Sequence, residues 1–115
     1  MYAILYVQFF CEVFIMIKHI VMWKFKEEAE GRTKLQNMEL VRDRLYALVP
    51  IVPQIKKMEI GFDFGKTPMS YDMMLYTEFE TKEDLNIYAV DSEHAKVKKI
   101  VAATTEARVV LDYEA

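Results

Sequence analysis

The chain has 115 residues, about the length of one domain, and its 53% hydrophobic and 29% charged residues are typical of a globular protein. Its net charge of −3 lacks the basic excess of most nucleic-acid-binding proteins. One cysteine, Cys11, and two histidines, His19 and His94, supply neither an internal disulfide nor a Cys/His zinc site. We therefore expect a small cytoplasmic domain with no cofactor, no metal and no nucleic-acid partner.

The N-terminal stretch differs from the rest of the chain. Residues 1–17 are apolar or aromatic except for Gln8 and Glu12. The run is shorter than the about 20 residues of a transmembrane helix, and it lacks the basic start and small-residue cleavage site of a signal peptide. We do not expect a membrane role. Two interpretations of residues 1–15 stay open: an upstream start codon before Met16, or an additional β-strand.

Apolar spacing predicts a strand and then a helix in the first half of residues 16–115. Residues 17–26 alternate with the period of two of a strand, with apolar residues on both faces at its centre. A polar break at 27–31 follows. Apolar residues then recur at steps of three and four from Leu35 to Val49, which predicts an amphipathic helix ended by prolines.

The second half predicts a hairpin, a helical segment and a last strand. Residues 55–64 and 71–80 alternate as two strands joined by a turn that contains Gly and Pro. Thr81 starts a short helix with a Thr-x-x-Asp capping pattern, and either Asp91 or the serine after it caps a further helix. A strand at 108–113 closes the chain. This order predicts an α+β, ferredoxin-like β-α-β-β-α-β fold.

Two helices can cover only one face of a four-stranded sheet. The first strand carries apolar residues on both faces, with Ile20 and Met22 on one and Val21, Trp23 and Phe25 on the other. One of these two sets must lie on the uncovered face. A large exposed apolar face is unusual on a monomer. We therefore predict a homodimer that packs sheet against sheet.

Residues 16–115 resemble the stress-responsive A/B barrel (dimeric α/β barrel, Dabb) family. The opening IKHIVMWKFK at 17–26 is similar to the family's first strand, and Gly61 follows a proline-terminated helix as in the family. FETKEDL at 79–85, followed by a tyrosine and a histidine six residues later, is similar to the pattern F-x-S-x-E-D-L-x-x-Y-x-x-H-P-x-H. The resemblance implies a ferredoxin-like protomer that forms a dimeric α/β barrel, preceded here by an extension at 1–15.

Within that family, the resemblance to a plant polyketide cyclase implies roles for three residues. That cyclase forms olivetolic acid by an aldol condensation without metal or cofactor. Its histidine base matches His94, its tyrosine matches Tyr88, and its first-strand histidine matches His19. The chain departs from it at Leu45, where the cyclase has a pocket tyrosine, and at Asp91 and the next serine, which replace the His-Pro of the family pattern.

These residues have a catalytic and a structural interpretation. An imidazole titrates near neutral pH, so His94 can act as base or acid, with Tyr88 stabilising an oxygen and His19 as a second polar contact. Alternatively, both histidines make structural hydrogen bonds and Tyr88 belongs to the core. Sheet aromatics are expected to fill the core first and to line a pocket second: Trp23, Phe25, Phe62 and Phe79.

Three functions follow from these interpretations. The first is a pocket for an apolar or aromatic small molecule, with cofactor-free cyclase or lyase proton transfer if the protein is an enzyme. The second is a non-catalytic, stress-linked binding or scaffold protein. The third, a cofactor-independent monooxygenase, rests on analogy of fold alone.

Overall fold

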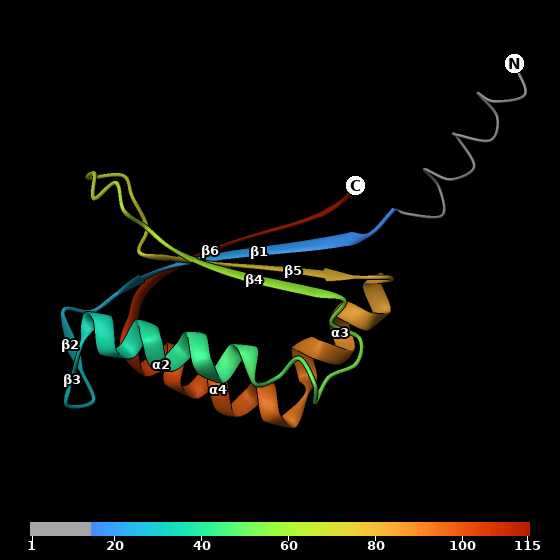
Figure 1. Ribbon diagram of the computed structural model, residues 1–115, viewed down its shortest axis with the longest axis horizontal. Helices are drawn as coiled ribbons and strands as arrows, with labels where there is room; N and C mark the ends of the chain where they lie inside the picture. Colours follow the sequence, from blue (N-terminus) through green and yellow to red (C-terminus); the bar gives the residue numbers. More distant parts are fainter. Residues whose placement is uncertain (1–14) are drawn as a thin grey trace, which may run out of the picture.

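Four strands form one antiparallel sheet, and two long helices cover one of its faces. The computed structural model describes residues 15–115, so the expectations for the N-terminal extension fall outside the described residues, Ile15 apart. The strands of the sheet are β1 (Ile17–Phe25), β4 (Lys57–Phe62), β5 (Met73–Phe79) and β6 (Thr105–Glu114), in the spatial order β4-β5-β1-β6. The helices are α2 (Lys34–Tyr46), α3 (Lys82–Val90) and α4 (Ser92–Thr104). Figure 1 shows α2 and α4 packed together beneath the sheet and α3 at one end, which confirms the predicted ferredoxin-like protomer.

β1 is a central strand, and its alternation decides which side chains reach the helices. It pairs antiparallel with β5 on one side and with β6 on the other. Val21, Trp23 and Phe25 are buried on the helical side. Because successive strand residues point to opposite faces, Ile20 and Met22 lie on the open face. The structure thus decides between the two arrangements that the sequence left open.

A small hairpin occupies the segment that the sequence predicts only as a polar break. β2 (Glu28–Ala29) and β3 (Arg32–Thr33) pair across a two-residue turn. Both turn residues, Glu30 and Gly31, have positive φ, at 54° and 73°. Such turns match the twist of a hairpin, but a strand of two residues shows no alternation that a sequence pattern could reveal.

α2 packs through a narrower stripe than the spacing predicts. Thr33 caps it, because its hydroxyl accepts from the Gln36 backbone N–H at 3.2 Å. The residues buried against the sheet are Met38, Val41, Leu45 and, just after the helix, Leu48. Leu35 is 55% exposed, because it lies about 90° from the middle of this stripe on a helix of 3.6 residues per turn. Val49 is exposed because it follows the last helical residue, Tyr46, where helical periodicity no longer applies.

One aspartate both ends α3 and begins α4. The Asp91 carboxylate accepts from the backbone N–H groups of Glu93 and His94, each at 2.9 Å. Asp91 is therefore the cap that the sequence left open between this residue and Ser92. The sharp turn between the helices sets Tyr88, on the last turn of α3, beside His94, on the first turn of α4.

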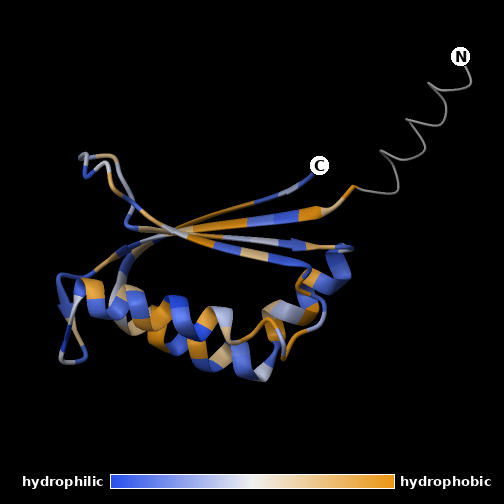
Figure 2. Ribbon diagram, in the orientation of Figure 1, coloured by the Kyte–Doolittle hydropathy of each residue, from blue (hydrophilic) through white to orange (hydrophobic). Residues whose placement is uncertain are grey.

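The sheet face away from the helices keeps an apolar surface. Met22, Val109, Leu111 and Tyr113 are between 37% and 58% exposed on this open face, and Ile20 is paired with Leu111 in the register. Figure 2 shows hydrophobic residues along the sheet as well as on the helices below it. The core therefore lies between sheet and helices, while a second apolar surface remains uncovered on the protomer.

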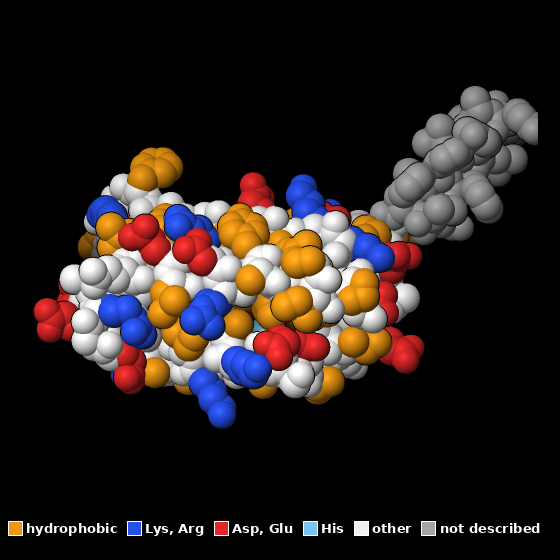
Figure 3. All heavy atoms as spheres, turned by 60° about the horizontal axis from the view of Figure 1, so that its bottom comes forward, with side chains coloured by type: hydrophobic (Ala, Val, Ile, Leu, Met, Phe, Trp, Pro, Cys, Tyr) orange, Lys and Arg blue, Asp and Glu red, His pale blue; other side chains and the backbone are white. Residues whose placement is uncertain are grey.

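The face that carries the helices has a mixed surface. Figure 3 shows Lys and Arg side chains interspersed with Asp and Glu among apolar groups, rather than one large patch of a single sign. Within residues 15–115, none of the helices has the length and apolar character needed to cross a membrane.

Candidate functional site

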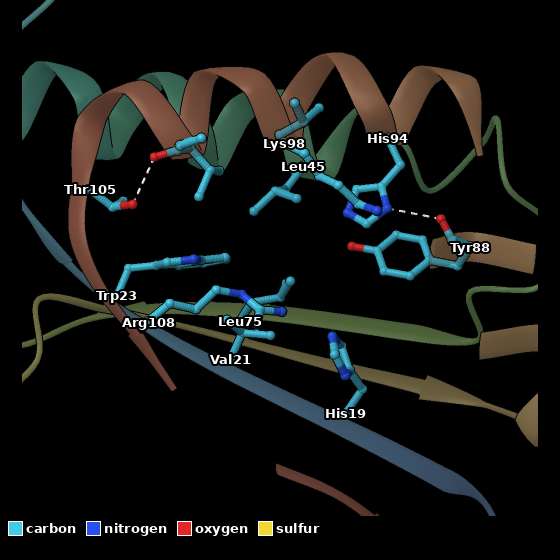
Figure 4. A pocket seen from close by; sticks show the side chains of 13 residues that line it. His19, Val21, Trp23, Leu45, Leu75, Tyr88, His94, Lys98, Thr105 and Arg108 are labelled. Atoms are coloured by element: carbon cyan, nitrogen blue, oxygen red, sulfur yellow. Dashed lines mark hydrogen bonds between the residues drawn. The ribbon is translucent and has the colours of Figure 1, made fainter. Parts of the chain in front are cut away.

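A cavity of about 400 Å³ lies between the sheet and the helices. Its volume is within the usual range for small-molecule sites. Its apolar lining residues are Val21, Leu45, Leu75, Val97, Val101 and Ala102. Its polar or charged lining includes six residues that Figure 4 labels: His19, Trp23, Tyr88, His94, Lys98 and Arg108. The structure thus places all three residues of the predicted His/Tyr set at one cavity.

Tyr88 and His94 are in direct contact at the site. Their rings stack with centroids 4.0 Å apart and planes 19° from parallel. His94 Nδ1 lies 2.8 Å from the Tyr88 backbone oxygen, which can only accept, so Nδ1 carries the proton and donates. The other ring nitrogen, Nε2, is then left unprotonated. This tautomer provides a hydrogen-bond acceptor, or a base, at the cavity.

Burial determines the protonation state of both groups. Burial lowers the pKa of His94 below its ordinary 6.5, and the charge of Lys98 acts in the same direction, although the bond to the Tyr88 backbone opposes it. Burial also raises the pKa of the Tyr88 hydroxyl, with the charge of Arg108 opposing. At neutral pH the site therefore combines a neutral imidazole with a protonated phenol.

His19 reaches the same cavity from β1. Its Nδ1 is hydrogen-bonded to the carboxylate of Asp112, the residue opposite it on β6. This bond orients the ring and places the Nδ1 proton toward Asp112, so that Nε2 is the free nitrogen. The rings of His19 and Tyr88 are 6.4 Å apart at their centroids and meet edge to face. Tyr88 therefore lies between the two imidazoles.

Two buried donors at the cavity have no partner within the described part of the chain. They are the Tyr88 hydroxyl and the Trp23 indole Nε1. The two residues are 1% and 4% exposed. Figure 4 shows the hydroxyl directed from α3 toward the cavity. A buried polar group without a partner is costly, and a ligand oxygen is a natural partner for each.

The predicted pocket aromatics separate into three groups. Trp23 lines the cavity. Phe25 and Phe79 are instead fully buried in the core, where Phe79 supports the Tyr88 ring at a centroid distance of 5.3 Å. Phe62, on β4, borders a separate hollow together with Met22 and other residues. Of the four, only Trp23 can contact a molecule in the cavity that holds the histidines.

Three polar residues around the site do not emerge from the sequence motifs. Asp112 and Arg108 both lie on β6, and Lys98 lies on α4. For the two β6 residues the signal is the strand register, which sets Asp112 against His19 and Arg108 against Trp23. A single sequence predicts a strand at 108–113 but not which residue of β1 each position meets. As for metals, residues 15–115 contain no cluster of three or more His, Cys, Asp or Glu side chains that could bind an ion.

These features define a ferredoxin-like α+β protein with a His/Tyr cavity between its layers. The chain belongs to the stress responsive A/B barrel domain (Dabb) family, whose model matches residues 17–115. No curated protein shows significant sequence similarity to it.

Solved structures with this fold include dimeric proteins. A dimeric protein of unknown function from Bacteroides fragilis is 33% identical, with a TM-score of 0.78 over 87% of this chain and 96% of that one. A Dabb family protein from Mesorhizobium loti is 17% identical, with a TM-score of 0.69 over 86% and 95% of the two chains. The hydroxynitrile lyase of Passiflora edulis is 18% identical, with a TM-score of 0.74 over 87% and 93%. The last two similarities show a common fold only.

Proposed function

We propose that this chain forms a homodimer in which each protomer binds an apolar or aromatic carbonyl compound and transfers a proton on it without a cofactor. The observation that carries the proposal is the Tyr88 hydroxyl. It is a buried, protonated donor without a partner among residues 15–115, and it lies between two imidazoles at an apolar cavity. This is an arrangement suited to an oxygen that gains negative charge.

The chemistry follows from the Tyr88 donor and the His94 base. A carbonyl oxygen of the ligand accepts from Tyr88, which makes the adjacent C–H more acidic. Nε2 of His94 takes that proton, and the C–H electron pair moves into an enolate whose oxygen Tyr88 stabilises. In a cyclase step the enolate carbon attacks a second carbonyl of the same molecule. The imidazolium then returns its proton to the new alkoxide, so that His94 is neutral again.

A lyase step uses the same groups in the reverse sense. An imidazole takes the proton of a hydroxyl, the carbon–carbon bond beside it breaks, and the departing carbon keeps the bonding electrons. The imidazolium then protonates that carbon. The Passiflora edulis neighbour is named a hydroxynitrile lyase and has this fold, which supports the class of chemistry but not a particular substrate.

Two observations support the homodimer. The open sheet face carries exposed apolar residues, among them Leu111 at 58% and Val109 at 43%. Dimers are also recorded for the related protein of Bacteroides fragilis and for a ferredoxin-like protein of Thermobifida fusca. Because the helices already cover the other face, pairing of two open faces buries the remaining apolar surface.

Deuterium exchange at the benzylic carbon of phenylacetone tests the proton transfer. Proton NMR in D2O follows the loss of that signal with the wild-type protein and two variants. Tyr88→Phe removes the donor, and it should not destabilise the fold because the hydroxyl has no partner to lose. His94→Asn removes Nε2, while its amide can still donate to the Tyr88 backbone oxygen. Each variant should slow the protein-dependent exchange by about a hundredfold, the lower range for a general base.

Tyr46→Phe is the matched control. Tyr46 is an exposed tyrosine on α2 whose hydroxyl accepts from the Ile60 backbone N–H at 3.1 Å, outside the cavity. This variant should exchange at the wild-type rate.

A second candidate function is non-catalytic binding, and the His94–Tyr88 backbone hydrogen bond favours it. That bond also fixes the turn between α3 and α4, which is a structural role. If wild type, Tyr88→Phe and His94→Asn all exchange deuterium into phenylacetone at the same rate, proton transfer by these residues is contradicted. Non-catalytic binding is then the function that remains.

A further inference from the structure

The cavity collects positive charge in a chain that is acidic as a whole. Lys98 and Arg108 line it, while its lining includes no Asp or Glu. The net charge of the chain is −3. The nearby carboxylate on β6, that of Asp112, is already bonded to His19. A charge of one sign, gathered around a cavity against the balance of the whole molecule, points to a ligand of the opposite sign.

Arg108 is the cation that is free to meet such a ligand. Within the described residues its guanidinium takes part in none of the ion pairs, whereas the Lys98 ammonium donates to the Ala89 backbone oxygen. Arg108 lies on the helical side of β6, opposite Trp23. Figure 4 shows its side chain extending from the strand into the middle of the cavity. A dimer formed through the open sheet face would leave it uncovered.

Three groups at the cavity that have no partner within residues 15–115 are hydrogen-bond donors. An indole N–H and a guanidinium donate only, so Trp23 and Arg108 require acceptor atoms. The protonated Tyr88 hydroxyl adds a third donor. A ligand that meets these donors must bring more than one acceptor oxygen. The guanidinium fork fits a carboxylate with two parallel hydrogen bonds.

From these three observations we infer that the cavity takes an aromatic or alicyclic oxo acid. Its carboxylate pairs with Arg108, its neighbouring carbonyl oxygen accepts from Tyr88, and its hydrocarbon part packs against the apolar lining, including Val21, Leu75 and Val97. The inference rests on the proposed function, because it assumes that the same cavity holds the reacting molecule. It adds a recognition residue, Arg108, and restricts the ligand class to anions.

A pair of probes isolates the carboxylate. Phenylpyruvate and phenylacetone are the same benzyl ketone, with a carboxylate in the first where the second has a methyl group. Isothermal titration calorimetry gives the dissociation constant of each for the wild-type protein. We expect phenylpyruvate to bind at least about tenfold more tightly, the lower end for a hydrogen bond to a charged group. Added salt should weaken phenylpyruvate binding and leave phenylacetone binding unchanged.

Two variants assign that preference to Arg108. Arg108→Met keeps an unbranched apolar stem and removes the charge, so the preference for phenylpyruvate should disappear while phenylacetone still binds. Arg44→Met changes the net charge by the same amount at an exposed position on the last turn of α2, and it should keep the preference.

The outcomes separate this inference from the proposed function. Equal affinity of wild type for the two probes, or a preference that survives Arg108→Met, would overturn the inference. If phenylacetone exchange still depends on Tyr88 in that case, the proposed function stands. Binding of neither probe to the wild-type protein would overturn both.

Discussion

His94 shows how a single side chain links ligand chemistry to the stability of the fold. Burial lowers its pKa below 6.5, so the folded chain binds a proton there at a lower pH than the unfolded chain does. Stability therefore falls as the pH drops below about 6.5, and this loss levels off once the pH passes the lowered pKa of the folded state. Protonation at low pH would also remove the base at Nε2.

We predict that His94→Asn weakens this pH dependence. Urea unfolding at about pH 7.5 and about pH 5.5 gives the free energy of unfolding of each protein under both conditions. The decrease between the two pH values should be smaller in the variant, because the group that the unfolded chain protonates is gone. His19 and the carboxylates are present in both proteins, so the difference reports on His94. A decrease of equal size in both would contradict the assignment.

At the scale of residues, sequence motifs pointed to the residues that meet at the candidate site but not to their partners. His94 and Tyr88 come together because they lie six residues apart on either side of the helix break at Asp91, a local relation that spacing can reveal. The Asp112–His19 bond spans 93 residues of sequence. It depends on the pairing of two strands, which no local pattern specifies. For the same reason Phe25 and Phe79 belong to the core although their residue type suits a pocket equally well.

The turn between α3 and α4 decides the geometry of the site at the scale of elements. The Asp91 carboxylate satisfies two backbone N–H groups at the start of α4 and carries a negative charge at the positive end of the helix dipole. We predict that Asp91→Ala lowers the free energy of unfolding by about 1 kcal/mol, with a range of about 0.5–2. Ser92→Ala, one residue on and exposed, should change it by less than about 0.5 kcal/mol.

Chemical denaturation of the two alanine variants measures this difference. A larger loss of unfolding free energy from Ser92→Ala than from Asp91→Ala would contradict the assignment of the cap to Asp91. Because the cap also sets His94 against Tyr88, Asp91→Ala should in addition slow the exchange of phenylacetone, whereas Ser92→Ala should not.

The sequence predicts the elements whose apolar periodicity extends over many residues, but not those that depend on a few residues. Alternation over five or more residues predicted β1, β4 and β5, and the spacing of three and four predicted α2. β6 begins at Thr105, earlier than residue 108 where its apolar alternation starts, because pairing with β1 extends it. The β2–β3 hairpin has two residues in each strand, so positive φ at Glu30 and Gly31, not periodicity, creates it.

At the scale of the whole molecule, the two faces of the sheet differ in what they contact. The helical side encloses the cavity, while the open face carries the exposed apolar residues. Figure 1 shows the connection between β4 and β5 rising on the open side, and its Phe64 and Met69 are 95% and 87% exposed. Two exposed apolar side chains beside an apolar sheet face extend the same surface. A second copy of the chain placed on that face would contact both features.

We predict that a charge on the open face separates the protomers. Leu111→Lys places an ammonium among Ile20, Val109 and their counterparts on the partner, where burial without an opposite charge is unfavourable. Val110→Lys is the matched control, because it adds the same charge one residue away, on the other face of β6, at a position that is already 49% exposed.

Sedimentation velocity should find wild type and Val110→Lys at twice the chain mass of 13.6 kDa, and Leu111→Lys at that mass. A monomeric wild type, or a dimer that persists in Leu111→Lys, would place the interface elsewhere. Because the cavity lies on the opposite side of the sheet, the Leu111→Lys monomer should still bind phenylacetone if it remains folded by circular dichroism.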